Sequence, residues 1–189
     1  MGLLRLCLTL DSSVRTVIAS HHTPILDIVM VAALIIGRRA GVCLALGALT
    51  AFRRRSTAQG VWQMILAIGL AALMSDAIVK PVVGRLRPFE SDPAIRVIDK
   101  KLETRSFPSG HAATAFAGAY ALARVWPEAR AGLWALAALT AVSRIYVGAH
   151  YPLDVLAGAL LGVVCAAFVV GGSIWYDRGS ARRLPPVPR

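Results

Sequence analysis

The sequence has little charge. Only 16% of its 189 residues are charged, whereas 57% are hydrophobic. A typical soluble domain carries roughly 25% charged residues. A soluble domain of this length is too small to bury so much apolar surface, but a lipid bilayer accepts that surface directly. The composition therefore argues against an ordinary soluble globular protein and predicts a membrane-embedded chain.

Cysteine is also scarce. Cys7, Cys43 and Cys165 are odd in number, far apart and without the spacing of metal ligands. Cys43 and Cys165 lie inside apolar runs, so we expect them to act as small hydrophobic side chains. Histidine, aspartate and glutamate form no cluster with metal-ligand spacing either. We therefore expect a protein that needs no metal ion and no other cofactor.

Acidic residues are few, with 10 Asp and Glu against 21 Lys and Arg, for a net charge of +11. A solvated basic surface and basic cytoplasmic loops could account for this excess. The basic residues stand in short clusters between apolar runs, without the aromatic side chains that stack on bases. We therefore expect no nucleic-acid partner. Anionic membrane lipids or a phosphate-bearing substrate fit the charge better.

Long apolar runs predict an all-α fold, a polytopic bundle of transmembrane helices. A membrane helix needs about 20 mostly apolar residues. Arg38 and Arg39 interrupt the first run. That run is therefore either one long tilted helix or two short segments, and the second reading would raise the number of spans to six. Gly158 and Gly162 in the last run favour close packing between helices. We assign five runs to spans: 24–52, 58–79, 109–126, 130–148 and 152–176.

Three parts of the chain differ in composition. Residues 1–23 form an N-terminal interfacial segment, in which 1–20 read as an amphipathic helix lying on the membrane surface. Residues 24–176 form a single membrane-embedded domain. Residues 177–189 are polar and contain three prolines, so we expect a flexible tail.

Two polar connections stand out between the predicted spans. Residues 80–108 form the one long loop, and 143–152 form a short one. Counting spans places both on one membrane face. The positive-inside rule assigns the opposite, arginine-rich face to the cytoplasm, together with the C-terminus. The polar connections of this multi-pass inner-membrane protein would then face the periplasm or cell exterior. The arginines of the opposite face are Arg53, Arg54, Arg55, Arg124, Arg130, Arg178, Arg182 and Arg183.

Cations and a helix start gather on the face with the polar connections. Arginine offers a planar fork that matches phosphate oxygens, and lysine offers a point charge. Ser109 is a good N-cap, and the amides of Gly110 and His111 would then point out of a helix N-terminus, where anions bind. Any single cation could simply extend to the membrane interface. The cations Lys80, Arg87 and Arg144 share this face with two histidines, which favours a phosphate site.

The histidines supply reactive groups for such a site. His150 and Asp154 are four residues apart, with Pro152 suited to a first helical turn. Asp154 can therefore accept a hydrogen bond from one imidazole nitrogen of His150 and leave the other as a nucleophile. His111 is a candidate proton donor. We also expect Asp76, one turn before Lys80, to hold the lysine side chain.

Together these residues resemble the signature of the type-2 phosphatidic acid phosphatase superfamily: Lys-x6-Arg-Pro at 80–88, Pro-Ser-Gly-His at 108–111, and Ser-Arg-x5-His-x3-Asp at 143–154. Each specified residue is present with the right spacing. The resemblance implies that His150 attacks phosphorus to form a phosphohistidine, that Asp154 orients His150, and that His111 protonates the leaving oxygen. It also implies a set of phosphate-binding residues: Lys80, Arg87, Ser109, Gly110 and Arg144.

The resemblance further implies a lipid phosphate as substrate and membrane lipids as neighbours. Because short members with an outward-facing site resemble carrier-lipid recycling enzymes, polyprenyl diphosphate ranks first. Phosphatidic acid, phosphatidylglycerol phosphate and glycolipid phosphates remain alternatives. A vanadate-dependent haloperoxidase shares the anion pocket, but those enzymes are soluble, and five spans argue against one. A non-catalytic lipid-phosphate binding or translocating protein is the other alternative, which intact His111, His150 and Asp154 argue against.

Overall fold

A computed structural model describes residues 2–53, 58–92, 95, 97–98 and 104–181. All regular secondary structure within these ranges is helical, which confirms the predicted all-α class. The α-helices are α1 (Gly2–Ser20), α2 (Pro24–Ile36), α3 (Gly41–Arg53), α4 (Ala58–Leu73), α5 (Lys80–Val83), α6 (Pro88–Ser91), α7 (Gly110–Val125), α8 (Arg130–Tyr146) and α9 (Pro152–Ala181). Short 3₁₀ turns cover Arg38–Ala40 and Pro127–Ala129, and a π-helical turn covers Met74–Val79.

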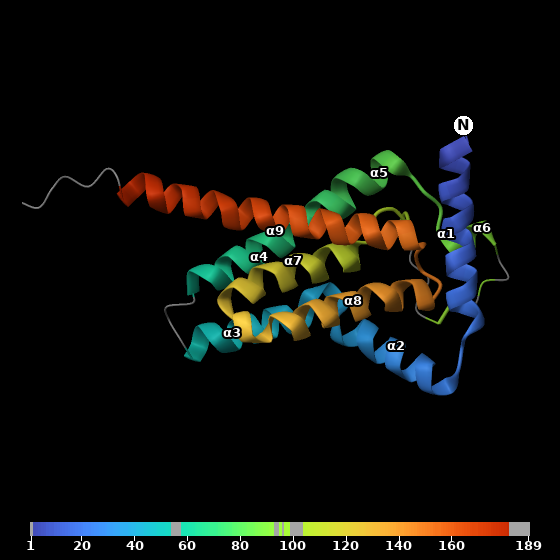
Figure 1. Ribbon diagram of the computed structural model, residues 1–189, viewed down its shortest axis with the longest axis horizontal. Helices are drawn as coiled ribbons and strands as arrows, with labels where there is room; N and C mark the ends of the chain where they lie inside the picture. Colours follow the sequence, from blue (N-terminus) through green and yellow to red (C-terminus); the bar gives the residue numbers. More distant parts are fainter. Residues whose placement is uncertain (1, 54–57, 93–94, 96, 99–103, 182–189) are drawn as a thin grey trace, which may run out of the picture.

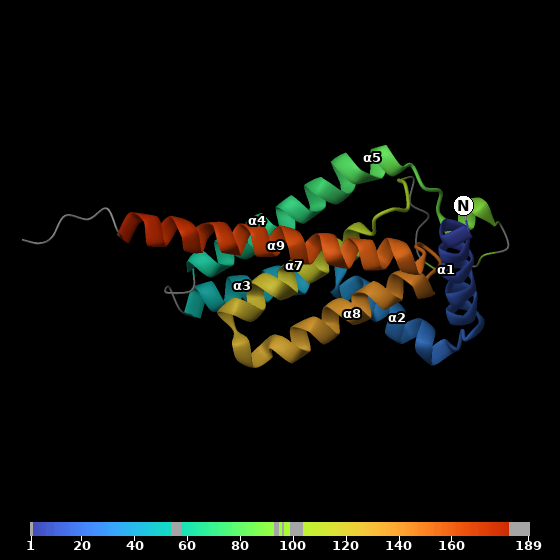
Figure 2. The same cartoon turned by 45° about the horizontal axis from the view of Figure 1, so that its top comes forward.

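The long helices form a bundle around α7. This helix packs against α4, α8 and α9, which run along the length of the molecule (Figure 1). Helix α1 lies across one end of the bundle in both views, close to α6 (Figures 1 and 2). The C-terminal part of α9 extends from the opposite end.

Small side chains let α7 and α9 approach each other closely. A side chain at Gly158 would overlap the carbonyl oxygen of Ser109, and one at Gly162 would overlap that of Ala113. The face of α7 is rich in buried alanines, which keeps the distance between helix axes short. The glycine pair therefore packs against α7, as predicted. This contact also fixes Ser109, at the start of α7, beside the first turns of α9.

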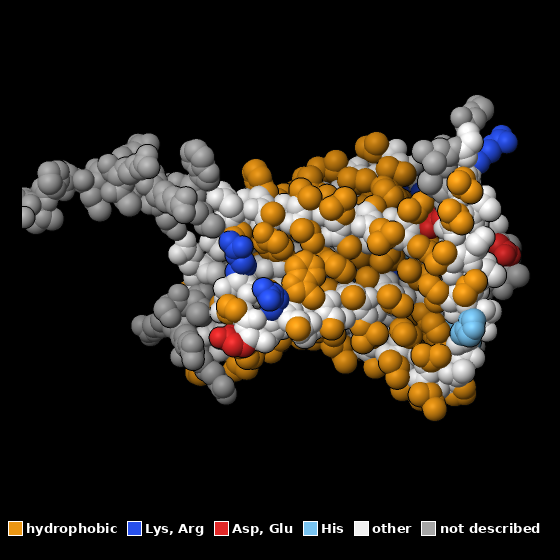
Figure 3. All heavy atoms as spheres, viewed as in Figure 1, with side chains coloured by type: hydrophobic (Ala, Val, Ile, Leu, Met, Phe, Trp, Pro, Cys, Tyr) orange, Lys and Arg blue, Asp and Glu red, His pale blue; other side chains and the backbone are white. Residues whose placement is uncertain are grey.

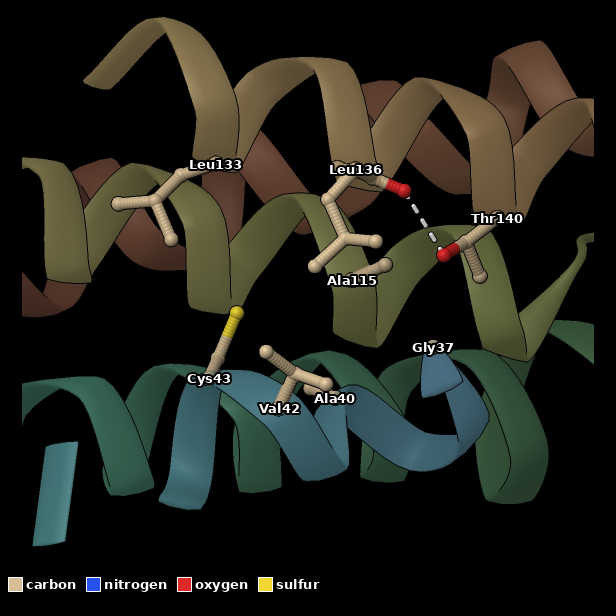
Figure 4. A pocket seen from close by; sticks show the side chains of 9 residues that line it. Gly37, Ala40, Val42, Cys43, Ala115, Leu133, Leu136 and Thr140 are labelled. Carbon is tan, nitrogen blue, oxygen red and sulfur yellow. Dashed lines mark hydrogen bonds between the residues drawn. The ribbon is translucent and has the colours of Figure 1, made fainter. Parts of the chain in front are cut away.

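The first apolar run is two helices rather than one straight helix. Helices α2 and α3 are bent by 52° on either side of the 3₁₀ turn Arg38–Ala40. Gly37 stands at the bend, where a side chain would overlap that of Thr140 on α8. The close-up in Figure 4 shows Gly37 below Thr140, whose hydroxyl donates to the carbonyl of Leu136 at 2.8 Å. A void lies between this bend and the helices α7 and α8. Its volume is only about 10 Å³, too small for a substrate.

Within the described residues, two helical stretches are long and apolar enough to cross a membrane, Ala58–Ser91 and Pro152–Gly172. A third is added if the bent pair α2 and α3 counts as one span. Because α7 and α8 have only 16 and 17 residues, the total of five spans stays a prediction. Hydrophobic side chains cover the middle of the surface in Figure 3 and charges lie toward its ends. On α9 the exposed apolar residues recur every fourth position: Leu156, Leu160, Val164 and Phe168.

The C-terminal helix is longer than the sequence predicted. Helix α9 continues to Ala181, although we expected the flexible tail to begin at residue 177. Residues 182–189 of that tail lie outside the described residues. So do four arginines assigned to the cytoplasmic face, namely Arg54, Arg55, Arg182 and Arg183.

Candidate active site

The three motifs of the sequence lie at 80–88, 108–111 and 143–154, and we call them the three clusters. They meet at the end of the bundle that α1 covers. The backbone amide of Ser109 donates to the carbonyl of Asp154 at 2.8 Å, which joins the starts of α7 and α9. The guanidinium of Arg87 donates to the carbonyl of Ala149 at 2.9 Å, which joins the segment before α6 to the one before α9. A cavity of about 440 Å³ opens between them. Its lining is Ile68, Gly69, Ala72, Asp76, Lys80, Arg87, Thr104, Gly110, His111, Thr114 and His150.

Lys80 reaches this cavity from a π-helical turn at the end of α4. The backbone amide of Lys80 donates to the carbonyl of Ser75, five residues earlier. Such wide turns are frequent at functional sites. The Lys80 ammonium donates to Asp76 at 2.6 Å, so the expected pairing of these residues is confirmed. Gly84 then ends α5 with a φ of +63°, a left-handed conformation that glycine adopts without strain.

Arg87 is rigidly held and has no solvent exposure. Its Nε donates to the carbonyl of Thr104 at 2.6 Å, and its Nη2 donates to the hydroxyl of Thr104 at 3.0 Å. Its Nη1 lies 3.3 Å from Nε2 of His150. These bonds fix the guanidinium in one orientation, so a ligand that meets it does not have to order the side chain first.

The start of α7 is a capped helix N-terminus at the cavity wall. Ser109 is the N-cap, and its hydroxyl accepts a hydrogen bond from the amide of Ala112 at 3.4 Å. Gly110 and His111 follow and line the cavity. A side chain at Gly110 would come within 2.8 Å of an Asp76 carboxylate oxygen, so a larger residue there would displace the Asp76 side chain. The amides of this first turn and the helix dipole favour an anion in the cavity.

His150 lies between an arginine and a carboxylate. Its side chain is 1% exposed, with Nε2 facing Arg87 and Nδ1 3.6 Å from Asp154 Oδ2. Arginine only donates, so Nε2 must present its lone pair and Nδ1 must carry the proton toward Asp154. Burial, together with the charges of Arg87 and Arg144 and against the effect of Asp154, lowers the pKa of His150 from 6.5 to about 4. The imidazole is therefore neutral at physiological pH, as a nucleophile requires.

The eight residues predicted from the motifs fall into two groups. Five line the cavity, and the other three, Ser109, Arg144 and Asp154, are fully buried behind it. Arg144 lies in the last turn of α8, and its carbonyl accepts the amides of Ala149 and His150, both at 3.2 Å. The structure thus brings all three clusters together, and their chemical roles stay predictions.

Three further residues bear on Asp154 and were missed in the sequence. Arg85 Nη1 donates to Asp154 Oδ1 at 2.7 Å, and the hydroxyl of Ser106 donates to Asp154 Oδ2. Arg85 Nη2 donates to Asp11 of α1 at 2.5 Å. Arg85 stands in the first motif, two residues before Arg87, which was the available signal. Asp11 only interrupts an apolar pattern, and nothing in the sequence indicates its partner.

Comparison with known proteins supports this arrangement. The family model of the PAP2 superfamily matches residues 60–175. An undecaprenyl-diphosphatase of Sulfolobus acidocaldarius is 39% identical over 95 residues, which are 48% of this chain and 45% of that protein. The undecaprenyl-diphosphatase BcrC of Bacillus subtilis is 32% identical over 149 residues, 77% of this chain and 74% of that protein. The chain thus spans less than half of the archaeal relative.

The fold is also similar to a solved structure. The crystal structure of LpxE from Aquifex aeolicus superposes with a TM-score of 0.74 at 30% sequence identity. The match covers 86% of this chain and 95% of that one. The similarity therefore extends over most of the fold.

Proposed function

The chain belongs to the PAP2 superfamily, and from this premise we propose that it is a membrane phosphatase that hydrolyses a lipid phosphate or diphosphate through a phosphohistidine. The carrying observation is the cavity at which Lys80, Arg87, His111 and His150 converge. A neutral imidazole with its lone pair beside a fixed guanidinium is suited to attack phosphorus while the cation meets the phosphate oxygens.

The first step makes one bond and breaks one. Nε2 of His150 attacks phosphorus, and the bond from phosphorus to the leaving oxygen breaks as His111 gives that oxygen a proton. The Nδ1 proton of His150 faces Asp154, which stabilises the positive charge that develops on the ring. Water then attacks phosphorus, His111 takes a proton from the water, and the bond from phosphorus to Nε2 breaks with its electrons returning to nitrogen.

Fixed positive charges position the phosphoryl group and neutralise the negative charge on its oxygens. The transferred phosphoryl group carries its charge on equatorial oxygens, so positioning and neutralisation dominate catalysis. We propose that Lys80, Arg87 and the amides at the start of α7, which line the cavity, bind these oxygens together with Arg144, which is buried behind it. Arg87 is held by the carbonyls of Thr104, Arg105 and Ala149 and by the hydroxyl of Thr104, so little reorganisation is needed when the substrate binds.

The cavity also suggests a lipid substrate. Beside its charged residues it is lined by Ile68, Gly69 and Ala72, which lie along α4 in the direction of the membrane-spanning part. An apolar tail could lie against these side chains while the phosphate meets the cations. We rank polyprenyl diphosphate first, since two relatives are named for undecaprenyl diphosphate.

We further propose how the enzyme lies in its membrane. It would have five spans in the inner membrane, with the cavity on the periplasmic or outer face and the C-terminus in the cytoplasm. Helix α1 would lie in the interface as a separate segment of residues 1–23. Its exposed apolar side chains support this placement: Leu6, Leu8, Leu10, Val14 and Val17.

A substrate panel tests the proposal. Purified protein in detergent is given undecaprenyl diphosphate, phosphatidic acid, phosphatidylglycerol phosphate and a glycolipid phosphate, with phosphate release measured. We expect release from at least one lipid that survives EDTA and is absent in His150→Ala. No release from any lipid, or equal release by His150→Ala, would refute the proposal. Activity lost in EDTA and restored by magnesium or zinc would refute the metal-free mechanism.

A further inference from the structure

We propose that Asp11 of the N-terminal helix is a positioning residue of the active site, which acts through Arg85 on Asp154 and so sets the charge beside His150. The inference rests on the proposed function, because it assigns His150 as the nucleophile. It gives α1 a role in the reaction in addition to its contact with the membrane.

Asp11 is a buried carboxylate on a helix that is otherwise largely exposed. Its side chain is 3% exposed, while most described side chains of α1 face outward. One oxygen accepts the backbone amide of Leu153 at 2.7 Å, and the other accepts Arg85 Nη2 at 2.5 Å. Leu153 is in the first turn of α9, whose amides have no partner within the helix. Asp11 therefore holds the helical turn that carries Asp154.

Arg85 links Asp11 to the catalytic pair. Its two terminal nitrogens bind different carboxylates, Nη2 that of Asp11 and Nη1 Oδ1 of Asp154 at 2.7 Å. The guanidinium also lies 4.1 Å from the centre of the Tyr151 ring, which fixes its plane. The planar guanidinium of Arg85 is held by Asp11, Asp154 and the Tyr151 ring. A shift of the Asp11 carboxylate would therefore also shift the Asp154 carboxylate.

The charges show why Asp11 matters to His150. Asp154 Oδ2 accepts the hydroxyl of Ser106 and the amide of Tyr151, and it faces His150 Nδ1. Asp11, Arg85 and Asp154 together carry one negative charge, which remains available to the imidazole. Without the carboxylate of Asp11, Arg85 would neutralise Asp154, and the imidazole would lose this anionic support.

The other charged groups around His150 make this support important. Arg87 approaches Nε2 from the segment before α6, and Arg144 adds a second positive charge from the end of α8. Across the cavity lie Lys80 at the start of α5, Asp76 in the π-helical turn before it, and His111 on α7. Because cations face Nε2, the charge that develops on the attacking ring depends on the carboxylate at Nδ1.

Charge-neutral substitutions test the inference. Asp11→Asn keeps the size of the side chain and an oxygen for the Leu153 amide, but removes the charge. We expect kcat to fall at least about tenfold with KM within about twofold. The pH midpoint of His150, followed by NMR of histidine-labelled protein with His150→Gln as the assignment reference, should move lower. The double variant with Arg85→Gln again carries one negative charge, so kcat and the midpoint should return toward wild type.

Ile18→Ala is the matched control. Ile18 packs against two buried apolar clusters and carries no charge, so this change loosens the docking of α1 and leaves the charges in place. If Asp11 only anchored α1, Ile18→Ala would reproduce the loss in kcat and the double variant would stay impaired. Either result would overturn the inference, as would an unchanged His150 midpoint in Asp11→Asn. The NMR titration reports on His150 even if no lipid is hydrolysed, so it separates this inference from the proposed function.

Discussion

At the scale of single residues, burial decides the protonation state of His150. Loss of water, reinforced by Arg87 and Arg144, lowers its pKa from 6.5 to about 4. The attacking nitrogen is therefore neutral at every pH above about 4. We expect protonation of His150 to leave kcat/KM unchanged as pH falls through 6.5 and to lower kcat/KM only as pH falls through about 4. A pH series corrected for the ionisation of the substrate measures this limb, and an acid limb of His150 near 6.5 would contradict the burial argument.

The same shift acts on stability with a defined sign. In the unfolded chain His150 binds a proton as pH falls through 6.5, whereas in the folded chain it binds one only as pH falls through about 4. Between these values the unfolded state binds more protons, so the free energy of unfolding decreases as pH falls. His150→Gln should remove this contribution and flatten the stability curve in that window, as measured by thermal unfolding in detergent.

The two histidines should fail in different ways. His150→Ala removes the nucleophile, and in a comparable triad such losses are about 10⁴-fold or more. His111→Ala keeps the nucleophile and removes the proton donor, which costs about 10²–10⁴-fold with a poor leaving group. With a nitrophenyl phosphate the leaving group needs no proton, so the His111 variant should stay active or accumulate an acid-labile phosphoenzyme. A label that maps to Ser109 instead of His150 would reverse the assignment.

At the scale of elements, spacing predicted contacts that are local. His150 and Asp154 flank a helix start, and Asp76 and Lys80 lie one turn apart, so their pairing follows from helix geometry. The bend between α2 and α3 was left open because it depends on Gly37 meeting Thr140, about a hundred residues away in sequence. The close approach of this bend to α8 is a tertiary contact, which amino-acid composition alone does not predict.

The contact between α9 and α7 can be tested with one methyl group. In Gly158→Ala the new side chain would overlap the Ser109 carbonyl and push α9 away from the phosphate-binding turn. We expect a loss of about 1–3 kcal/mol in the free energy of unfolding and a fall in kcat. Gly172→Ala on the same helix meets no atom within 4 Å, so it should keep the kcat of wild type and be at least as stable. Equal behaviour of the two variants would show that the helices are not in tight contact.

At the scale of the whole molecule, the site is assembled from segments far apart in the chain. The motifs predict eight site residues, because each lies in a cluster with recognisable spacing, and the structure places all eight at or directly behind one cavity. Asp11 could not be found in this way, since its partners Arg85 and Leu153 are 74 and 142 residues distant. Its burial exists only because α1 crosses the end of the bundle (Figure 2). Long-range ion pairs of this kind need the complete fold.

The orientation of the bundle in the membrane can also be measured. The loops at the cavity end include α6, and the opposite end includes the turn Pro127–Ala129, with Arg124 and Arg130 on either side of it. Basic residues near span ends remain in the cytoplasm. We therefore expect the cavity end to face the periplasm or exterior. In a variant without Cys7, Cys43 and Cys165, single cysteines can report on each end.

Ser91→Cys in α6 and Glu128→Cys in the opposite turn form a matched pair, because both side chains are exposed. A thiol reagent that does not cross membranes should label the Ser91 variant in intact spheroplasts and the Glu128 variant only after permeabilisation. The reverse pattern would place the cavity in the cytoplasm, and labelling of both before permeabilisation would contradict a membrane-spanning bundle. The orientation decides the substrate pool, because a lipid diphosphate is hydrolysed only in the leaflet that the cavity faces.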